Sequence, residues 1–542
     1  MSERARSHWA WGYVDQFPSD DERRELAARV AFSLGVDQPA LRPLPSPAEA
    51  RVSARRVEVP ASIAAFCTGD DGERVRHTYG RGYHDLVRGF RGDFAGAPDL
   101  VAFPRDEGEV ALALEACERA GVACIPYGGG TSVVRGVEAE VGGRFAGALS
   151  LDLRHLSGLL EVDPVSRAAR VGAGTLGPAL EAALAPHGFS LRHFPQSFEF
   201  STVGGWVATR AGGHFATLYT HIDDLVESLR MVTPRGVLAT RRLPASGAGP
   251  SPERLLLGSE GAFGVITEAW LRVQARPRFR SAAALHFGTF EAAVEAVRAI
   301  AQAGLHPSNC RLLDATEALL NGVTFDGSCV VLLGFESADA PQRERLERAL
   351  ALGAGAGGAC PKGPSHREGE AAVGDQTSRA WRDAFIRAPY LQSALVSLGM
   401  LADTFETACT WDALPRVHEA ITTAVRAALE REAGVGVLSC RFTHVYPDGP
   451  APYYTFVAPA RHGDEIAQWQ AIKDAASQAI VGAGATITHH HAVGRLHRPW
   501  YEQERPALFG AALEAAKASF DPAGVMNPGA LLPPRSEAGP TR

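Results

Sequence analysis

The stretch Pro126-Tyr127-Gly128-Gly129-Gly130-Thr131-Ser132 decides how the rest of the chain is interpreted. It follows the apolar, strand-like residues 121–125 and places three glycines before two hydroxyl side chains. Backbone N–H groups of consecutive glycines can approach an anion closely, in conformations that a Cβ atom forbids. The pattern favours a cradle for a pyrophosphate, while the alternative from this stretch alone is an ordinary flexible turn.

Two further loops of the same character follow. Residues 194–213 read Phe-Pro-Gln-Ser-Phe-Glu-Phe-Ser-Thr-Val-Gly-Gly-Trp-Val-Ala-Thr-Arg-Ala-Gly-Gly, and residues 258–267 read Gly-Ser-Glu-Gly-Ala-Phe-Gly-Val-Ile-Thr. Between them, a strand at 229–232 runs into the turn Thr-Pro-Arg-Gly. Three separated Gly/Ser/Thr loops indicate one extended ligand with several polar segments, and a dinucleotide suits that description.

Composition limits the class of protein. A chain of 542 residues is too long for one hydrophobic core, so two or three domains are expected. The net charge of −7, with acidic and basic residues interspersed, argues against a nucleic-acid binder. Eight cysteines without a Cys-x-x-Cys pair suit a reducing cytosol. With no apolar signal-peptide core and no run near the ~20 apolar residues of a membrane span, we expect a soluble, cytoplasmic protein.

The order of elements predicts an α+β or α/β domain after a helical N-terminal region. Residues 19–21 can cap a helix over 22–34, and the aromatic run Trp9–Tyr13 is expected to anchor the N-terminus onto another domain. From residue 99 strands and helices alternate. The expected strands are 100–104, 121–125, 148–153 and 168–171, and the expected helices are 106–120 and 180–184.

A G-x-G-x-x-G motif at residues 172–177 offers a competing interpretation. Read literally, it is a Rossmann fingerprint with Glu199 near the position expected for the ribose contact, which implies NAD. A single fingerprint is weak, and the unit before it is not a clean βαβ. There is no Gly-Lys-Ser/Thr, so a P-loop is not expected.

Taken together, the motifs resemble the flavin-binding domain of the vanillyl-alcohol oxidase superfamily. More narrowly, residues 126–132, 199–212, 224–236 and 258–268 resemble alkyldihydroxyacetonephosphate synthase and its bacterial relatives, and the resemblance extends from Trp9 to Leu532. It implies an α+β protein with a PCMH-type, two-subdomain FAD-binding domain. The expected domains are an N-terminal helical region (1–95), the FAD domain (96–275), a cap domain (276–480), a C-terminal segment with a histidine motif and helices that return to the FAD domain (481–535), and a tail (536–542).

The resemblance also implies the cofactor and its contacts. Because residues 126–132 lack the histidine or cysteine with which superfamily members tether the flavin, we expect non-covalent FAD. His193 matches a family histidine near the flavin. The predicted FAD-binding residues are Pro126, Tyr127, Gly128, Gly129, Gly130, Thr131, Ser132, His193, Gln196, Ser197, Phe198, Glu199, Phe200, Ser201, Thr202, Thr209, Arg210, Ala211, Gly212, Gly258, Ser259, Glu260, Gly261, Ala262, Phe263 and Gly264.

The cap domain is expected to carry an antiparallel sheet flanked by helices. The pattern predicts helices over 290–303, 341–352 and 412–432, strands over 329–334, 437–446 and 453–457, and an exposed loop over 353–370. A single helix is expected over 504–520 in the C-terminal segment.

His489-His490-His491 is the most conspicuous polar cluster. On a strand, His489 and His491 would face one side and His490 the other. A metal site is one explanation, although no HExxH-type spacing supports it, and a structural histidine run is another. The third is a set that orients or protonates substrate. The family's His-His-His-x-Val-Gly pattern, which the synthase needs for activity, favours this third explanation, so no metal is predicted.

The other candidate catalytic and substrate-binding residues are Tyr453, Arg311 and Arg441. By resemblance Tyr453 is the general acid/base that takes a proton from the substrate carbon, with Tyr454 as the fallback if the register is off by one; an aromatic on a strand is otherwise usually core. A phenol with a pKa near 10 needs nearby positive charge or the flavin to lower it. Arg311 matches a family arginine needed for activity, and its alternative is an ion pair with Asp314 one helical turn away. Arg441 is a candidate for anion binding.

One departure from the family concerns the substrate. The synthase has a substrate-binding arginine thirteen residues before its Phe-Glu-Thr motif, but here that position before Phe405-Glu406-Thr407 is Gln392. An amide cannot pair bidentately with a phosphate as a guanidinium does. Arg387 can substitute if the helix is shifted; otherwise the substrate differs from an acylated dihydroxyacetone phosphate.

The resemblance implies a reaction in which an acyl chain on a dihydroxyacetone phosphate-type ketone is exchanged for an alkyl chain. In the family this proceeds through a flavin N5 adduct, without net redox change, and belongs to ether lipid biosynthesis. The alternative is an FAD-linked oxidase or dehydrogenase of a 2-hydroxy acid or alcohol, of the D-lactate dehydrogenase and glycolate oxidase type, which Met526-Asn-Pro-Gly also fits. The expected partners are a small-molecule substrate with a long alkyl chain, a second copy in a homodimer and, at most, a peripheral membrane contact.

Overall fold

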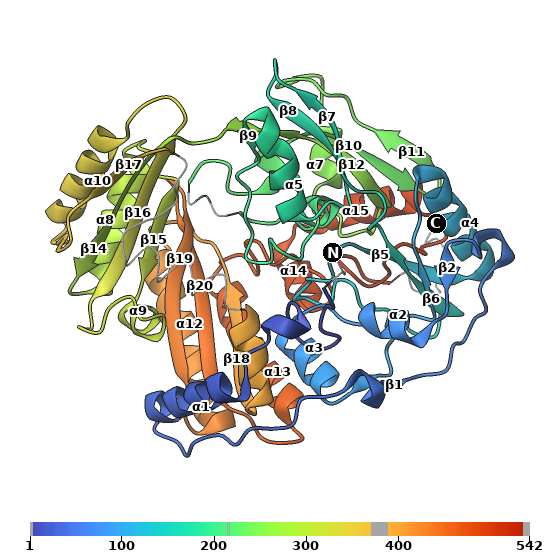
Figure 1. Ribbon diagram of the computed structural model, residues 1–542, viewed down its shortest axis with the longest axis horizontal. Coiled ribbons are helices and arrows are strands. Elements are labelled where there is room, and N and C mark those ends of the chain that lie inside the picture. Colours follow the sequence, from blue (N-terminus) through green and yellow to red (C-terminus); the bar gives the residue numbers. More distant parts are fainter. Residues whose placement is uncertain (1–3, 214, 216, 370–388, 535–542) are drawn as a thin grey trace.

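The computed structural model describes residues 4–213, 215, 217–369 and 389–534. Figure 1 shows two lobes: one is built around a large sheet with helices beside it, and the other contains two smaller sheets. The predicted α+β class is confirmed. Among the described residues, no helix is both long and apolar enough to cross a membrane.

The first small sheet carries the stretch quoted at the outset. Its order is β2 (Cys67–Thr68), β4 (Leu100–Ala102), β6 (Gly147–Asp152) and β5 (Val122–Tyr127), with β4, β6 and β5 parallel. Helix α4 (Glu107–Ala120) connects β4 to β5; Asp106 caps its first turn and Gly121 ends it with φ 61°. Because β5 ends at Tyr127, the glycines form the loop at the carboxyl end of this sheet.

The second small sheet is antiparallel. Its order is β11 (Gly236–Ala239), β10 (Val226–Thr233), β12 (Val265–Arg272), β8 (Ala168–Gly172) and β7 (Leu159–Asp163). The G-x-G-x-x-G motif joins β8 to α5 (Gly177–Leu184), and both neighbours of β8 are antiparallel. The motif is therefore not part of a Rossmann βαβ unit, and its glycines pack closely: a Cβ on Gly174 would lie 1.9 Å from the Leu153 carbonyl oxygen.

The large sheet is antiparallel throughout. Its order is β17 (Ser365–Glu368), β14 (Phe279–Phe287), β16 (Cys329–Ser337), β15 (Asn309–Leu313), β19 (Val437–Val445), β20 (Pro450–Pro459) and β18 (Met400–Glu406). One face packs in a common apolar core with α8 (Phe290–Gln302), α10 (Arg343–Gly355), α12 (Leu414–Ala433) and α13 (Glu465–Gly482). The expected antiparallel cap with flanking helices is confirmed.

The remaining helices and strands of the described residues are named here with their bounds. They are η1 (Val14–Gln16), α1 (Asp20–Leu34), η2 (Pro47–Glu49), β1 (Arg51–Val52), η3 (Ala61–Ile63), α2 (Asp71–Arg76), α3 (Tyr83–Phe90), β3 (Asp93–Phe94), η4 (Ala185–His187), β9 (Phe189–Ser190), α6 (Val203–Thr209), η5 (Ile222–Asp224), α7 (Pro252–Leu256), β13 (Gln274–Ala275), α9 (Ala315–Leu320), α14 (Arg498–Glu504) and α15 (Ala507–Phe520).

The helix predicted over 504–520 is confirmed as α15 (Ala507–Phe520), which begins three residues later because Pro506 has no N–H for a continuous helix and separates it from α14. Two other predicted elements are wrong. The predicted loop over 353–370 contains the edge strand β17, which pairs with β14. Residues 489–491 lie in a loop and not on a strand, so the expected alternation of the three histidines does not apply.

Both ends of the chain pack on distant elements. Trp9 and Trp11 are buried and contact Phe90 and Phe200, which confirms the predicted N-terminal anchor. At the other end, Met526 bridges in parallel to Cys124 of β5. The C-terminal segment therefore returns to the first small sheet, as expected.

Candidate active site

The three Gly/Ser/Thr loops predicted from the sequence meet in space. A Cβ on Gly128 would lie 2.3 Å from Thr202 Oγ1, and a Cβ on Gly129 would lie 1.8 Å from the Phe200 carbonyl oxygen. The third loop joins them, since Glu260 N donates to the Ala208 carbonyl at 2.8 Å and a Cβ on Gly261 would lie 2.9 Å from Pro126 Cγ. The three loops therefore lie in direct contact, as one shared ligand site requires.

The residues at this junction fit FAD. Gly130 has φ +66°, and a Cβ on any of the three glycines would lie within 2.3 Å of Thr202, Phe200 or Tyr127, so only bare backbone lets the loop pack this closely. Ser259 Oγ and both ring nitrogens of His193 are buried and have no hydrogen-bond partner among the described residues. Burial, and then His221, lowers the pKa of His193 to about 3, so its ring is neutral. These polar atoms are available to a bound dinucleotide.

Other predicted cofactor residues use their side chains to shape the loops. The Glu260 carboxylate accepts from Val493 N at 2.8 Å and Gly494 N at 2.7 Å, and burial raises its pKa to about 7. Arg210 Nε pairs with Asp223, and Phe263 packs on Phe520. Tyr127 and Thr209 donate hydrogen bonds to the carbonyls of Arg76 and Gly205, and Ser132 and Ser201 accept hydrogen bonds from Gly136 N and Trp206 Nε1. The rings of Phe198 and Phe200 pack on Trp206 and Tyr13. For these residues, contact with FAD stays a prediction.

A second site lies on the large sheet, where three strands place side chains in a row. Arg441 of β19 is directly opposite Tyr453 of β20, which is directly opposite Glu406 of β18. Cross-strand partners share a face of the sheet, and adjacent residues point to opposite faces. Tyr454 therefore faces the helices, where it is fully buried and its hydroxyl lies 2.9 Å from His418 Nδ1. Of the two tyrosines, only Tyr453 joins the row.

Tyr453 is surrounded by polar groups. Its hydroxyl donates to Thr404 Oγ1 at 2.9 Å, and the Arg441 guanidinium carbon lies 4.0 Å above its ring. The rings of His490 and His491 lie 5.8 and 5.4 Å away. Burial raises the pKa of Tyr453, while the Arg441 charge and the Thr404 bond act in the opposite direction. Arg441 supplies the positive charge that the sequence argument required.

Two arginines lie close together beside this row. Arg441 Nη1 donates to Glu317 Oε1 at 2.7 Å. Burial, and then the Arg441 charge, lowers the pKa of Arg311 to about 9. Arg311 lies on β15, so the helical spacing assumed for an ion pair with Asp314 does not apply; the Asp314 carboxylate accepts from Glu317 N and Cys440 N. Paired buried guanidinium groups are suited to an anionic ligand.

The histidine loop is wrapped around one carboxylate. Glu406 accepts hydrogen bonds from Thr488 Oγ1 (2.6 Å), His489 N (2.6 Å), His490 N (3.0 Å) and His491 N (2.9 Å). Burial opposes ionisation of Glu406, but the neighbouring histidines and the Thr488 bond hold its pKa well below the ordinary value. This carboxylate, rather than strand pairing, fixes the conformation of residues 489–491.

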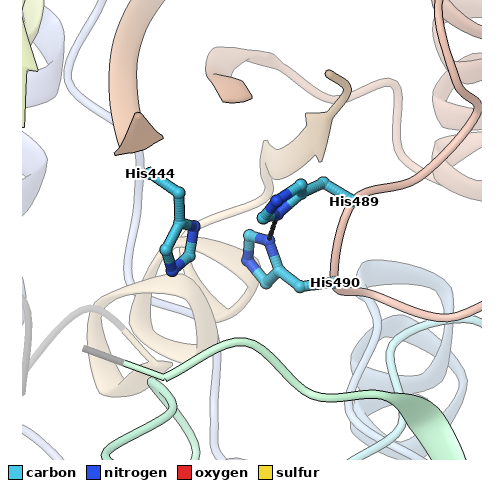
Figure 2. A group of neighbouring side chains, drawn as sticks. All are labelled: His444, His489 and His490. Atoms are coloured by element: carbon cyan, nitrogen blue, oxygen red, sulfur yellow. Dashed lines mark hydrogen bonds between the residues drawn. The ribbon is translucent and has the colours of Figure 1, made fainter. Parts of the chain in front are cut away.

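The histidine rings form a network with residues that sequence reasoning missed. His489 Nε2 lies 2.8 Å from Tyr446 Oη and 3.2 Å from His221 Nε2, and its Nδ1 lies 3.1 Å from His490 Nδ1 (Figure 2). His444 Nε2 lies 3.0 Å from the Gly213 carbonyl. Simple alternation would put His444 and Arg441 on opposite faces. A β-bulge between Phe442 and His444 reverses this, so only the bulge brings His444 to the site.

The three rings in Figure 2 also bear on the metal alternative. His444, His489 and His490 each offer a nitrogen within 4.8 Å of the others, a ligand set that zinc accepts. His84, Asp85 and Glu138 form another such group, but Arg88 Nη2 lies 2.6 Å from Glu138 and 3.2 Å from Asp85, which compensates the negative charge. The absence of a metal stays a prediction.

Gln392, which stands at the position of the missing arginine, is not part of this row. Gln392 Nε2 donates to the Ala402 carbonyl at 3.0 Å, and its Oε1 accepts from Trp11 Nε1 at 3.3 Å. It also lies 3.3 Å from Asp403, which binds Trp469 of α13 on the helix side of the sheet. Gln392 thus joins the N-terminal anchor to β18, and a substrate contact by its amide is not supported. Arg387 lies outside the described residues.

Replacing Glu406 by glutamine tests the loop architecture. We expect the free energy of unfolding to fall by about 2–4 kcal/mol, because the amide presents N–H groups to backbone donors that need an acceptor. Thermal and urea denaturation measure the change, and Glu419→Gln on the exposed side of α12 is the matched control. An unchanged midpoint for Glu406→Gln would contradict the role given to the carboxylate.

Comparisons with known proteins agree with this geometry. Residues 98–241 match the family described as FAD binding domain, and residues 276–531 match the family described as FAD linked oxidases, C-terminal domain. The chain is 30% identical to alkyldihydroxyacetonephosphate synthase of Dictyostelium discoideum, over 85% of this chain and 77% of that protein. It is 27% identical to glycolate oxidase subunit GlcD of Bacillus subtilis (strain 168), over 80% of this chain and 89% of that protein.

A solved structure of an alkyldihydroxyacetonephosphate synthase superposes with a TM-score of 0.78 at 24% identity, covering 98% of this chain and 99% of the other. That likeness shows the shared fold. The sequence relationship and the two family matches carry the assignment, including the cofactor. The chain belongs to the alkyldihydroxyacetonephosphate synthase family, within the PCMH-type FAD-binding superfamily, and is an FAD-dependent enzyme.

Proposed function

We propose that the enzyme exchanges the acyl chain of an acylated dihydroxyacetone phosphate-type ketone for a long-chain alcohol, without net oxidation or reduction. One observation carries the proposal: the row Arg441–Tyr453–Glu406 and the histidine loop lie against the predicted FAD-binding loops. A Cβ on Gly212 would lie 3.0 Å from His490 Cβ and 3.3 Å from His444 Cε1. Substrate held by the row would therefore be close to the cofactor.

The side chains suit the steps that this exchange requires. Tyr453 takes the proton from the substrate carbon and returns it, and the Arg441 charge above its ring favours the phenolate. Arg311 and Arg441 hold the anionic end of the substrate. Bound FAD would supply the electron-accepting ring that the exchange needs. His193, Ser259 and the backbone of residues 128–130 would hold it.

An exchange assay tests the proposal. Holoenzyme is incubated with a palmitoylated dihydroxyacetone phosphate and deuterated hexadecanol, and the products are separated by mass spectrometry. We expect a labelled ether and one free palmitate for each ether formed. Free palmitate without labelled ether would indicate hydrolysis and would contradict the exchange.

The second candidate is an FAD-linked oxidase or dehydrogenase of a 2-hydroxy acid or alcohol. The engagement of Gln392 within the protein favours it, because the arginine that the synthase uses for its substrate has no counterpart at this position. The glycolate oxidase subunit among the relatives is consistent with it. Anaerobic bleaching of the flavin by D-lactate or glycolate, together with no alkyl exchange, would select this function.

FAD is expected to be bound non-covalently. The loop at residues 126–132 contains neither a histidine nor a cysteine that could form a link to the flavin. After denaturation and ultrafiltration of the purified protein, the yellow colour should pass through the filter. Colour retained with the polypeptide would contradict the prediction.

Homodimeric assembly, a long-chain substrate and a cytoplasmic location complete the proposal. They rest on the family resemblance and on the eight cysteines, none of which forms a disulfide with another in the described part of the chain. Light scattering during size-exclusion chromatography measures the oligomeric state directly.

A further inference from the structure

Two adjacent histidines, His489 and His490, and the distant His221 form a continuous line of ring-to-ring contacts. His490 Nδ1 lies 3.1 Å from His489 Nδ1, and His489 Nε2 lies 3.2 Å from His221 Nε2. His221 Nδ1 lies 2.9 Å from the Arg210 carbonyl oxygen. Each ring therefore uses its nitrogens toward the next, from beside Tyr453 to the end of α6.

The Arg210 carbonyl at the end of this line determines the tautomer of each histidine ring. A carbonyl only accepts, so His221 carries its proton on Nδ1 and its Nε2 is an acceptor. His489 then donates from Nε2, toward both His221 Nε2 and the Tyr446 hydroxyl oxygen 2.8 Å away, while Tyr446 donates to Thr220 Oγ1. This leaves His489 Nδ1 as an acceptor for His490 Nδ1–H. A carboxylate oxygen of Glu406 lies 3.5 Å from His490 Nδ1 and favours the same tautomer. This pattern leaves the lone pair of His490 Nε2 available to accept a proton.

We propose that His490, His489 and His221 form a proton relay between the reaction centre and solvent. The inference rests on the proposed function, which fixes the need for such a path. Exchange converts an ester and an alcohol into an ether and a carboxylic acid. Because that acid ionises at neutral pH, each turnover leaves one proton to be released.

The relay accounts for that proton step by step. His490 Nε2 accepts the proton and His490 passes its Nδ1 proton to His489 Nδ1. His489 then passes its Nε2 proton to His221 Nε2, and the resulting imidazolium releases a proton to water. Only hydrogen atoms move during the transfer itself. Afterwards the rings flip, or their N–H protons exchange with water, which restores the starting tautomers.

The surroundings keep the inner rings neutral until a proton arrives. The groups that face His489 and His490 are His444 and Arg441 of β19, Tyr446 directly after that strand, Glu406 of β18, Tyr453 of β20, His491 and His221. Burial lowers the pKa of His490 to about 3 and that of His489 well below its usual value, so both rings are neutral at neutral pH and hold a second proton only in passing. The far end reaches the surface, since Arg210 and Tyr219 beside His221 have side chains 57% and 45% exposed.

Two variants of His221 separate a relay from a structural role. His221→Gln keeps a donor and an acceptor but cannot ionise, and His221→Ala leaves space for free imidazole. We expect exchange turnover to fall about tenfold or more in both, with flavin content and absorbance unchanged. Added imidazole should restore the turnover of His221→Ala in proportion to the imidazole concentration, and it should leave the turnover of His221→Gln low. Wild-type turnover in His221→Gln would overturn the relay.

A readout without turnover tests the same chain. Long-range ¹H–¹⁵N correlation spectra of ¹⁵N-histidine-labelled holoenzyme, assigned with His→Gln variants, report the tautomer of each ring. We expect Nδ1–H for His490 and His221 and Nε2–H for His489; the opposite tautomer on His489 would overturn the relay. If no exchange occurs but these tautomers are found, the proposed function fails and the hydrogen-bonded chain stands. In that case the imidazole test is repeated with hydroxy acid oxidation as the reaction, because this reaction also releases a proton. If imidazole did not restore the turnover of His221→Ala there, the relay would be overturned.

Discussion

Tyr453→Phe is expected to lower the turnover number for alkyl exchange by about 10³-fold while FAD remains bound, since a positioned acid/base group typically contributes 10²–10⁴-fold. The substitution removes only the hydroxyl, which donates to Thr404 Oγ1 at 2.9 Å. The ring stays, so its stacking with Arg441 and His490 is preserved. Turnover under saturating substrate, with flavin content measured by absorbance, gives the effect.

Tyr454→Phe is the matched control, because it removes the neighbouring hydroxyl on the opposite face of β20. That hydroxyl is buried against His418, so the loss should appear as a small decrease in thermal stability and leave turnover near that of the wild type. If the two variants retained equal turnover, the assignment of Tyr453 as the base would be wrong.

Acidification is expected to destabilise the folded protein steeply. Burial is the first cause that lowers the pKa of His193 and His490 to about 3 and of His491 and His497 to about 4, against about 6.5 when unfolded. The unfolded chain therefore binds more protons below pH 6.5, and stability is lost as the pH falls through that value. From pH 7.5 to 5.5 the four residues together remove about 5 kcal/mol from the free energy of unfolding.

Urea titrations of holoenzyme between pH 7.5 and 5.5, followed by tryptophan fluorescence, measure this slope. His497→Gln should reduce the loss of stability between pH 7.5 and 5.5 by about 1.4 kcal/mol, because it removes one of these histidines. The Nδ1 of His497 donates to the Ala492 carbonyl, a bond that an amide can replace. His462→Gln should leave the slope unchanged, since that side chain is 83% exposed. A stability that does not vary with pH over this range would show that these rings are protonated in the folded state.

The sequence predicts the cofactor domain well for a physical reason. Positions where only a bare backbone fits are visible as glycines, and at most glycines of the three loops a Cβ would lie within 3 Å of a neighbouring atom. Helix α4 follows in the same way from local signals, with Asp106 at its start and Gly121 at its end. Such features depend on few residues close together in the chain.

The candidate site on the large sheet is predicted less completely, because it depends on pairings between distant residues. Nothing local indicates that Glu406 binds residues 488–491, or that a bulge turns His444 toward Arg441. His221 has no motif around it, and the sequence analysis did not identify it. Gln392 was considered for the substrate because of its spacing from Phe405, while its contacts with Trp11 and Ala402 arise only in the folded chain.

The return of the C-terminus to β5 has a consequence for biosynthesis. Cys124 N donates to the Val525 carbonyl at 2.8 Å, and Asn527 N donates to the Cys124 carbonyl at 2.9 Å. The strand that leads into the first FAD loop thus acquires a neighbour that is synthesised about four hundred residues later. On the ribosome, the nascent chain emerges with this strand edge uncovered until residues 525–527 have been synthesised, so loading of FAD is expected to follow the synthesis of that segment.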